Sequence, residues 1–253
     1  MREHVREMDS DRLALSADLN TFFGNTRGAG YTFVQPSVLA ALRVREAVVE
    51  AALPFGYFHE NNDPGSDRDQ LSLGNPWAAL LYLPDCECGL SRLSVGIAAP
   101  VASNRGLHDR LALALARGAV GDWDGYLWLA DTLPLVLGAS TRKDIRWLRL
   151  IWDADVIVGL PGGGRDPEFG AQMAGEADLL FGWRTTLSAR ISGTYYPTFS
   201  GDVFQSALST YFRYTSRNDS VAVRFVMNLD GPAGFSFPSG MWGLGLSYAR
   251  SFF

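Results

Sequence analysis

The feature that most constrains the fold of this chain is a period-two alternation of apolar with polar or small residues. In one segment, Trp152, Ala154 and Val156 share one parity, while Asp153 and Asp155 share the other. Alternation of this kind predicts a strand with two different faces. The same pattern recurs over residues 13–20, 34–44, 49–57, 93–99, 177–181, 187–195, 221–230 and 242–249. Several runs reach about ten residues, which exceeds the ~5–6 residues of most soluble strands and approaches the ~9–11 that a tilted strand needs to cross a bilayer.

The connections between these runs alternate between long and short. Long connections are expected at residues 21–33, 59–74, 101–128, 159–171, 197–202 and 230–240, and short ones at 45–47, 84–89, 141–145, 183–185 and 215–219. Up-and-down barrels of the outer membrane have an even number of strands, with long loops at one end and short turns at the other. The sequence therefore predicts an all-β fold, a membrane-spanning antiparallel barrel of about twelve strands over residues 12–253. Residues 1–11 are expected to form an N-terminal periplasmic stub.

A soluble β-sandwich would also alternate, with its apolar face forming a core. Two further features favour the barrel. The polar face is sparse and mixes small residues with isolated charges, as expected of a confined lumen. Aromatic residues such as Trp77, Trp128, Trp183 and Tyr211 fall near predicted strand ends, where the interfacial girdles of membrane barrels lie. The apolar faces, including that of residues 77–83, are accordingly predicted to face lipid.

The composition removes several other classes of protein. With 27 Asp+Glu against 22 Lys+Arg and no basic block, the chain is not expected to bind nucleic acid. Two cysteines cannot supply a disulfide framework. No run approaches the ~18 apolar residues of a helical membrane span. Residues 1–12 also lack the apolar stretch of a signal peptide, so we expect the sequence to be a mature or truncated form.

The end of the chain carries the most specific motif, with Leu246, Tyr248, Phe252 and Phe253 in a closing alternating run. This segment resembles the last strand of bacterial outer-membrane β-barrels, the porin- and transporter-like proteins, which commonly finish on an aromatic residue. Arg250 departs from that pattern because it shares the parity of Tyr248 and Phe252. The resemblance implies a place in the bacterial outer membrane, in contact with its lipids. It also implies that Tyr248, Phe252 and Phe253 form a signal read by the barrel-assembly machinery.

Charged residues are concentrated on the parity that the barrel would turn inward. The predicted lumen-lining residues are Glu50, Arg149, Asp153, Asp155, Glu176, Asp178, Arg190 and Arg224. Paired carboxylates could perform acid–base chemistry or bind calcium. We favour a ladder of acids and arginines on adjacent strands, because buried charges need partners. In an open lumen such a ladder acts as a field on permeating ions.

The remaining candidate residues predict little chemistry. His4, His59 and His108 are expected in solvated segments, away from any nucleophile at alternating spacing, so we predict no enzyme and no cofactor. Cys86 and Cys88 lie in an expected short turn, where a local disulfide is the first interpretation and free thiols the second. Without further ligands they do not make a zinc site.

Residues 101–128 form the longest connection. Residues 106–119 have the apolar spacing of a short amphipathic helix. This helix could rest on the outer rim or fold into the lumen. We expect a pore for small hydrophilic solutes. The alternatives are a closed barrel that serves as a surface anchor, adhesin or structural partner, and a lipid-modifying enzyme.

Overall fold

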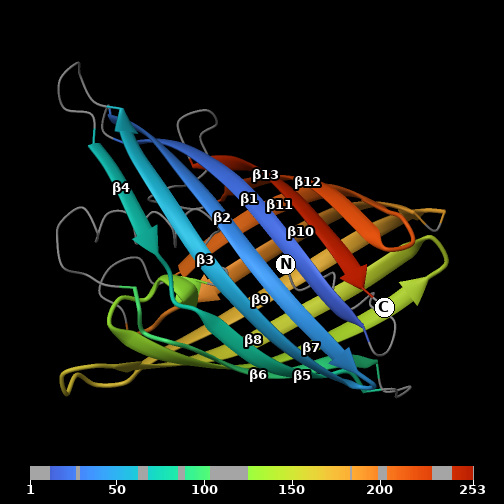
Figure 1. Ribbon diagram of the computed structural model, residues 1–253, viewed down its shortest axis with the longest axis horizontal. Helices are drawn as coiled ribbons and strands as arrows, with labels where there is room; N and C mark the ends of the chain where they lie inside the picture. The colour runs from blue at the N-terminus through green and yellow to red at the C-terminus, as the bar shows by residue number, and fades with distance from the viewer. Residues whose placement is uncertain are drawn as a thin grey trace.

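The computed structural model describes residues 12–26, 29–61, 68–84, 89–102, 125–182, 184–198, 204–229 and 241–252. These residues form a single antiparallel sheet whose strands tilt around a common axis (Figure 1). The strands are β1 (Leu13–Thr26), β2 (Ala29–Val44), β3 (Ala47–Asn61), β4 (Arg68–Leu73), β5 (Trp77–Tyr82), β6 (Leu90–Ala98), β7 (Thr132–Ile145), β8 (Leu148–Pro161), β9 (Glu168–Phe181), β10 (Thr185–Tyr195), β11 (Phe204–Thr215), β12 (Asp219–Asn228) and β13 (Trp242–Phe252). One 3-10 turn, η1 (Gly125–Trp128), precedes β7. No described helix is long and apolar enough to span a membrane.

The sheet closes on itself. β1 pairs with β13 from Leu13 opposite Phe252 to Phe23 opposite Trp242, and β2 pairs with β3. All of the thirteen strands except β4 have a partner on both sides, so twelve strands form the ring. The first residue of β1 and the last of β13 lie at the end of the barrel that carries the short turns. The predicted twelve-stranded barrel is confirmed.

Two short strands, β4 and β5, pair with the same edge of β3. β5 pairs with residues 47–52 of β3, and β4 pairs with residues 55–60 of the same strand. Gly74, Asn75 and Pro76 separate β4 from β5, and Pro76 has no N–H with which to continue a ladder. Within the described residues, β4 has no partner on its other edge. The predicted loop at 59–74 is therefore wrong at both of its ends, where β3 and β4 extend the sheet.

An apolar belt surrounds the outside of the barrel. Each of the twelve ring strands presents at least one large apolar side chain that is between 48% and 68% exposed. One such residue per strand, in ring order, is Leu19, Val38, Val49, Leu80, Val95, Leu137, Val156, Met173, Ile191, Phe212, Val223 and Leu246. A continuous apolar surface of this extent is unfavourable in water and is the surface that the hydrocarbon of a bilayer contacts. Along each strand, the side chains that alternate with these outward-facing residues point inward.

Two further sequence predictions are wrong, one about the orientation of a strand and one about a loop. Residues 77–83 were expected to turn Trp77 and Leu81 to lipid, but both are buried inside and Leu80 is outside. The expected loop at 21–33 is mostly strand, since β1 reaches Thr26 and β2 begins at Ala29. The reason is the same in both cases. This part of the inner wall is apolar, so polar residues do not mark the inward parity. The predicted helix at 106–119 and the stub at 1–11 lie outside the described residues.

Candidate functional site

Inward-facing charges gather on neighbouring strands on one side of the ring. The antiparallel register sets Arg149 of β8 opposite Asp178 of β9, and Glu176 of β9 opposite Arg190 of β10. Successive inward positions on a strand are two residues apart, so each strand contributes two or more charges to the same region. We call this group the charged layer. Its members are Arg92, Ser140, Arg142, Asp144, Arg149, Asp153, Glu176, Asp178, Ser188, Arg190 and Tyr211.

Asp153 is the central acceptor of the charged layer. It accepts hydrogen bonds from Ser140 Oγ at 2.6 Å, Arg190 Nη1 at 2.8 Å and Arg92 Nη2 at 3.3 Å. Asp153 and Arg92 are both almost completely buried. A buried carboxylate needs partners of this kind, because an unpaired charge in a low-dielectric wall is strongly unfavourable. Asp153 therefore ties β6, β7 and β10 to β8.

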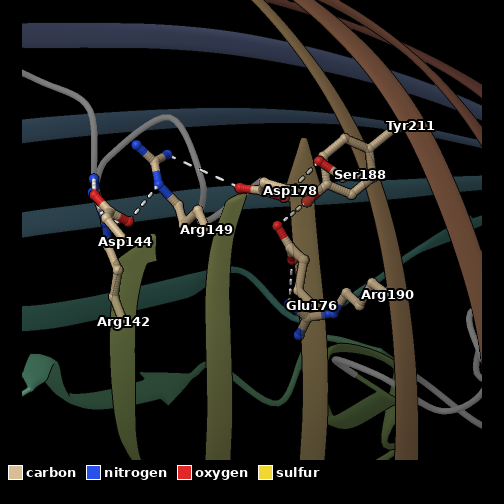
Figure 2. Close-up of polar contacts among 8 residues, drawn as sticks. All are labelled: Arg142, Asp144, Arg149, Glu176, Asp178, Ser188, Arg190 and Tyr211. Carbon is tan, nitrogen blue, oxygen red and sulfur yellow. Dashed lines mark hydrogen bonds and ion pairs between the residues drawn. The ribbon is translucent and has the colours of Figure 1, made fainter. Parts of the chain in front are cut away.

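Glu176 and Asp178 continue the layer on β9 (Figure 2). Arg190 Nη1 also donates to Glu176 Oε2 at 3.0 Å, so one guanidinium joins two carboxylates. The Tyr211 hydroxyl donates to Glu176 Oε1 from β11. Ser188 Oγ donates to Asp178 Oδ1 at 2.6 Å. Charge-assisted bonds of this kind are roughly twice as strong as neutral ones, so these side chains strengthen the contact of β9 with β10 and β11.

The layer extends to the end of the barrel with the short turns. Arg149 Nη1 lies 4.0 Å from Asp178 Oδ2, and its Nε donates to Asp144 Oδ1 at 3.2 Å. Arg142 Nε donates to the same oxygen at 3.0 Å. Asp144 lies beside the turn between β7 and β8 and is exposed. The charged layer therefore reaches from the interior of the barrel to its mouth.

The structure brings together five of the eight residues that the sequence predicted to line the lumen: Arg149, Asp153, Glu176, Asp178 and Arg190. The other three lie outside the charged layer. Glu50 is buried on β3, and Arg224 is partly exposed on β12, opposite Tyr211. Asp155 is buried over Gly138, where a Cβ would lie 2.2 Å from its Oδ1. That these eight residues act on a permeating solute stays a prediction.

Several members of the layer were not predicted from the sequence. Arg142 and Asp144 were assigned to a short turn at 141–145, but β7 continues to Ile145. Tyr211 was assigned to an interfacial girdle, whereas its hydroxyl lies inside. Arg92 could have been predicted from the sequence. It alternates with the outward-facing Leu93 on β6 and therefore has the parity of an inward-facing residue.

The other candidate residues are dispersed. His59 does not lie in a loop but on β3, where its Nδ1 is 2.7 Å from Asp69 Oδ1, and the Tyr57 hydroxyl donates to the same oxygen. His4, Cys86, Cys88, His108 and Phe253 lie outside the described residues. Among the residues that the structure describes, no group of three or more His, Cys, Asp or Glu could hold a metal ion.

The long-loop half of the lumen holds an apolar segment. The sequence left open whether residues 101–128 lie at the rim or in the lumen, and residues 126–129 at their end lie inside and are buried. The Trp128 ring packs edge-on against Phe33 at 6.1 Å between centroids, and Tyr126 packs against Trp77 at 5.0 Å. Because Phe33 and Trp77 face inward, this segment lies inside the lumen. We call residues 125–129 the plug.

Asn75, at the break between β4 and β5, holds the plug in place. Its side chain is fully buried, and its Oδ1 accepts the backbone N–H groups of Val101 at 2.9 Å and Ala102 at 2.8 Å. Its Nδ2 donates to the Leu129 carbonyl at 2.9 Å, and its own N–H donates to the Leu127 carbonyl at 2.6 Å. One side chain therefore fixes both ends of the long connection to the barrel wall.

Comparison with known proteins bears on the fold. No family model and no curated protein matches the chain. Among solved structures it is similar to the COG4313 outer membrane channel from Pseudomonas putida F1, at 12% identity and a TM-score of 0.67 over 97% of both chains. The beta domain of the Bordetella autotransporter Brka has 11% identity and a TM-score of 0.57, covering 96% of this chain and 100% of the other. The NanC porin has 6% identity and a TM-score of 0.56, covering 93% and 98%.

The fold is that of a bacterial outer-membrane β-barrel. The apolar belt agrees with it on independent grounds, because the outer faces of all twelve ring strands are suited to lipid. Tyr248 of the closing strand faces outward, on the parity that its resemblance to outer-membrane barrels implies. Recognition of the tail by the assembly machinery and the expected lack of enzymatic activity stay predictions.

Proposed function

We propose that the protein is an outer-membrane channel for small hydrophilic solutes, gated by the plug. The observation that carries this proposal is the contrast between opposite walls of the lumen. In the ring of twelve strands, β13 stands opposite β7. The inward-facing residues of β13 are Gly243, Gly245, Ser247, Ala249 and Ser251, all of them small. Small side chains on one wall leave the charged layer on the other wall facing space that water can occupy.

Partial exposure of inward-facing polar residues supports the same proposal. Ser247 of β13 and Asp18 of β1 are opposite each other in the register, and neither is buried. A solid core would bury both residues or replace them with apolar side chains. A polar, partly solvated inner face is typical of barrels that pass solutes.

In this proposal the plug closes the long-loop half of the lumen. Trp128 and Tyr126 fill the lumen between apolar side chains of β2 and β5, so a solute passes only when the plug moves. Residues 125–129 are held by ring packing and by bonds to Asn75, and these contacts must break before the plug can move. We therefore expect a channel that opens intermittently rather than one that is permanently open.

Single-channel recording in planar bilayers tests the proposed function. The refolded protein should give discrete current steps at constant voltage, interrupted by long closures. The control is the same amount of protein kept unfolded in urea, which should give none. If the refolded barrel inserts but never conducts, the proposed function is contradicted and a closed barrel serving as an anchor is favoured.

A further inference from the structure

We propose that the short-turn end of the barrel binds the anionic headgroups of phospholipids. The described turns at this end join β2 to β3, β7 to β8, β9 to β10 and β11 to β12, and β13 ends beside them (Figure 1). Their exposed basic residues, which we call the basic rim, are Arg45, Lys143, Arg146, Arg184, Arg217 and Arg250. The basic rim lies outside the lumen, so this binding would occur equally in a channel and in a closed barrel.

The exposed charges at this end of the barrel are mainly positive. Among the described residues, the exposed acids here are Glu46 and Asp144. Asp219 is partly exposed and lies 3.9 Å from Arg250. Asp85 and Glu87 of the remaining short turn lie outside the described residues, and counting them leaves the basic residues in excess. A surface with this balance attracts anionic groups.

The opposite end of the barrel has the reverse balance. Its exposed charged residues within the described ranges are Asp69, Asp131, Arg165 and Asp166, of which three are acids. The chain as a whole has a net charge of -5. The positive charge of the basic rim is therefore specific to the short-turn end.

Two of the turn arginines have a backbone conformation that arginine disfavours. Arg45 has a φ of 55° in the two-residue turn 45–46, and Arg146 has a φ of 54° in the turn 146–147. Glycine, asparagine and aspartate are the residues that suit a left-handed position in a hairpin turn. A side chain kept there at a cost in stability is expected to contribute something that glycine or asparagine lacks, and for arginine that is positive charge.

The basic rim borders the apolar belt, at the depth of lipid headgroups. Large outward-facing side chains at or beside the same turns are 43–62% exposed, namely Ile145, Trp147, Phe181, Tyr214 and Tyr248. Aromatic residues at such positions mark the boundary between the hydrocarbon and the headgroups. An arginine or lysine at this boundary can keep its apolar stem against the barrel and its charge among the phosphates.

The distribution of the basic rim favours lipid over an acidic protein as the partner. Its residues lie at four hairpins and on β13, so they follow much of the circumference of the ring. A docked protein would be matched by a cluster on one side, whereas lipid surrounds the whole barrel. Each basic residue near an anionic membrane surface adds to the attraction, so removing several should remove most of it.

Titration of single phospholipids into the detergent-purified protein, followed by native mass spectrometry, tests this proposal. Phosphatidylglycerol, which is anionic, should bind about fivefold more tightly than zwitterionic phosphatidylcholine with the same acyl chains, the effect of about one arginine near the headgroup. The variant R45N/R146N/R184Q/R217Q should bind the two lipids equally. The double variant R45N/R146N places asparagine where the backbone favours it, so it should fold and should already reduce the preference.

Two controls separate the effect of charge from other effects of the substitutions. R165Q removes an exposed arginine from the opposite end of the barrel and should keep the wild-type preference. R45K/R146K/R184K/R217K retains the positive charges and should also keep it. Equal binding of both lipids by the wild type overturns the proposal and favours an acidic protein as the partner. A preference that persists in R45N/R146N/R184Q/R217Q overturns its assignment to the turn arginines.

Discussion

Replacing Trp128 with alanine is expected to raise the time-averaged current through the reconstituted protein at least tenfold. The Trp128 ring is buried, packs against Phe33, and lies over Gly56 and Gly74, where added Cβ atoms would lie 3.3 Å and 3.1 Å from it. Removing a buried tryptophan typically costs ~3–5 kcal/mol. If only about 1.4 kcal/mol of that is lost from the closed state relative to the open state, the ratio of open to closed channels rises tenfold.

The measurement is the open fraction in single-channel records at matched protein density. The control is W152A, which removes an exposed tryptophan from the lipid-facing side of β8 and should leave the open fraction unchanged. N75A releases both ends of the long connection and should act in the same direction as W128A. If W128A and W152A have the same open fraction as the wild type, the plug is not the gate.

Replacing Asp153 with alanine is expected to lower the free energy of unfolding by ~3–5 kcal/mol. The substitution leaves the guanidiniums of Arg92 and Arg190 near each other without the carboxylate that both contact. Arg92 is 1% exposed, so water cannot replace the lost partner. The size of the effect reflects the loss of a carboxylate that two guanidiniums share in the barrel wall, rather than the intrinsic strength of the ion pairs.

Urea unfolding in lipid vesicles, followed by far-ultraviolet circular dichroism, measures this loss. D144A is the matched control, because Asp144 also binds two arginines but is 47% exposed, and surface pairs contribute about 0–1 kcal/mol. If D153A is no less stable than D144A, the charged layer is not a buried network, and the structural account of the lumen is incorrect at that point.

The sequence predicted the fold where the two faces of a strand differ in chemistry. On β8, Asp153 and Asp155 alternate with Trp152, Ala154 and Val156, because one face meets lipid and the other a polar lumen. This contrast disappears where the inner wall is also apolar. Trp77 faces Tyr126 of the plug and Leu81 is buried inside the barrel, so the parity of β5 was assigned in reverse.

The charged layer was only partly predictable for a different reason. The alternation along a strand predicts which residues face inward. It does not predict which residues contact one another, because those contacts depend on how strands that lie far apart in the chain are aligned. Arg92 contacts Asp153 across 61 positions, and Asn75 contacts Leu129 across 54. No local pattern distinguishes Asn75 from an ordinary turn residue. Its role follows from the long connection returning into the barrel.

Labelling of adjacent positions on β13 tests the central division between lumen and lipid most directly. S247C and L246C are made with Cys86 and Cys88 replaced by serine, since Ser247 faces inward and Leu246 is 53% exposed on the outer belt. A charged, membrane-impermeant thiol reagent is added during single-channel recording. We predict a stepwise fall in current for S247C and no change for L246C. Equal or reversed responses would contradict a water-filled path along the polar faces of these strands.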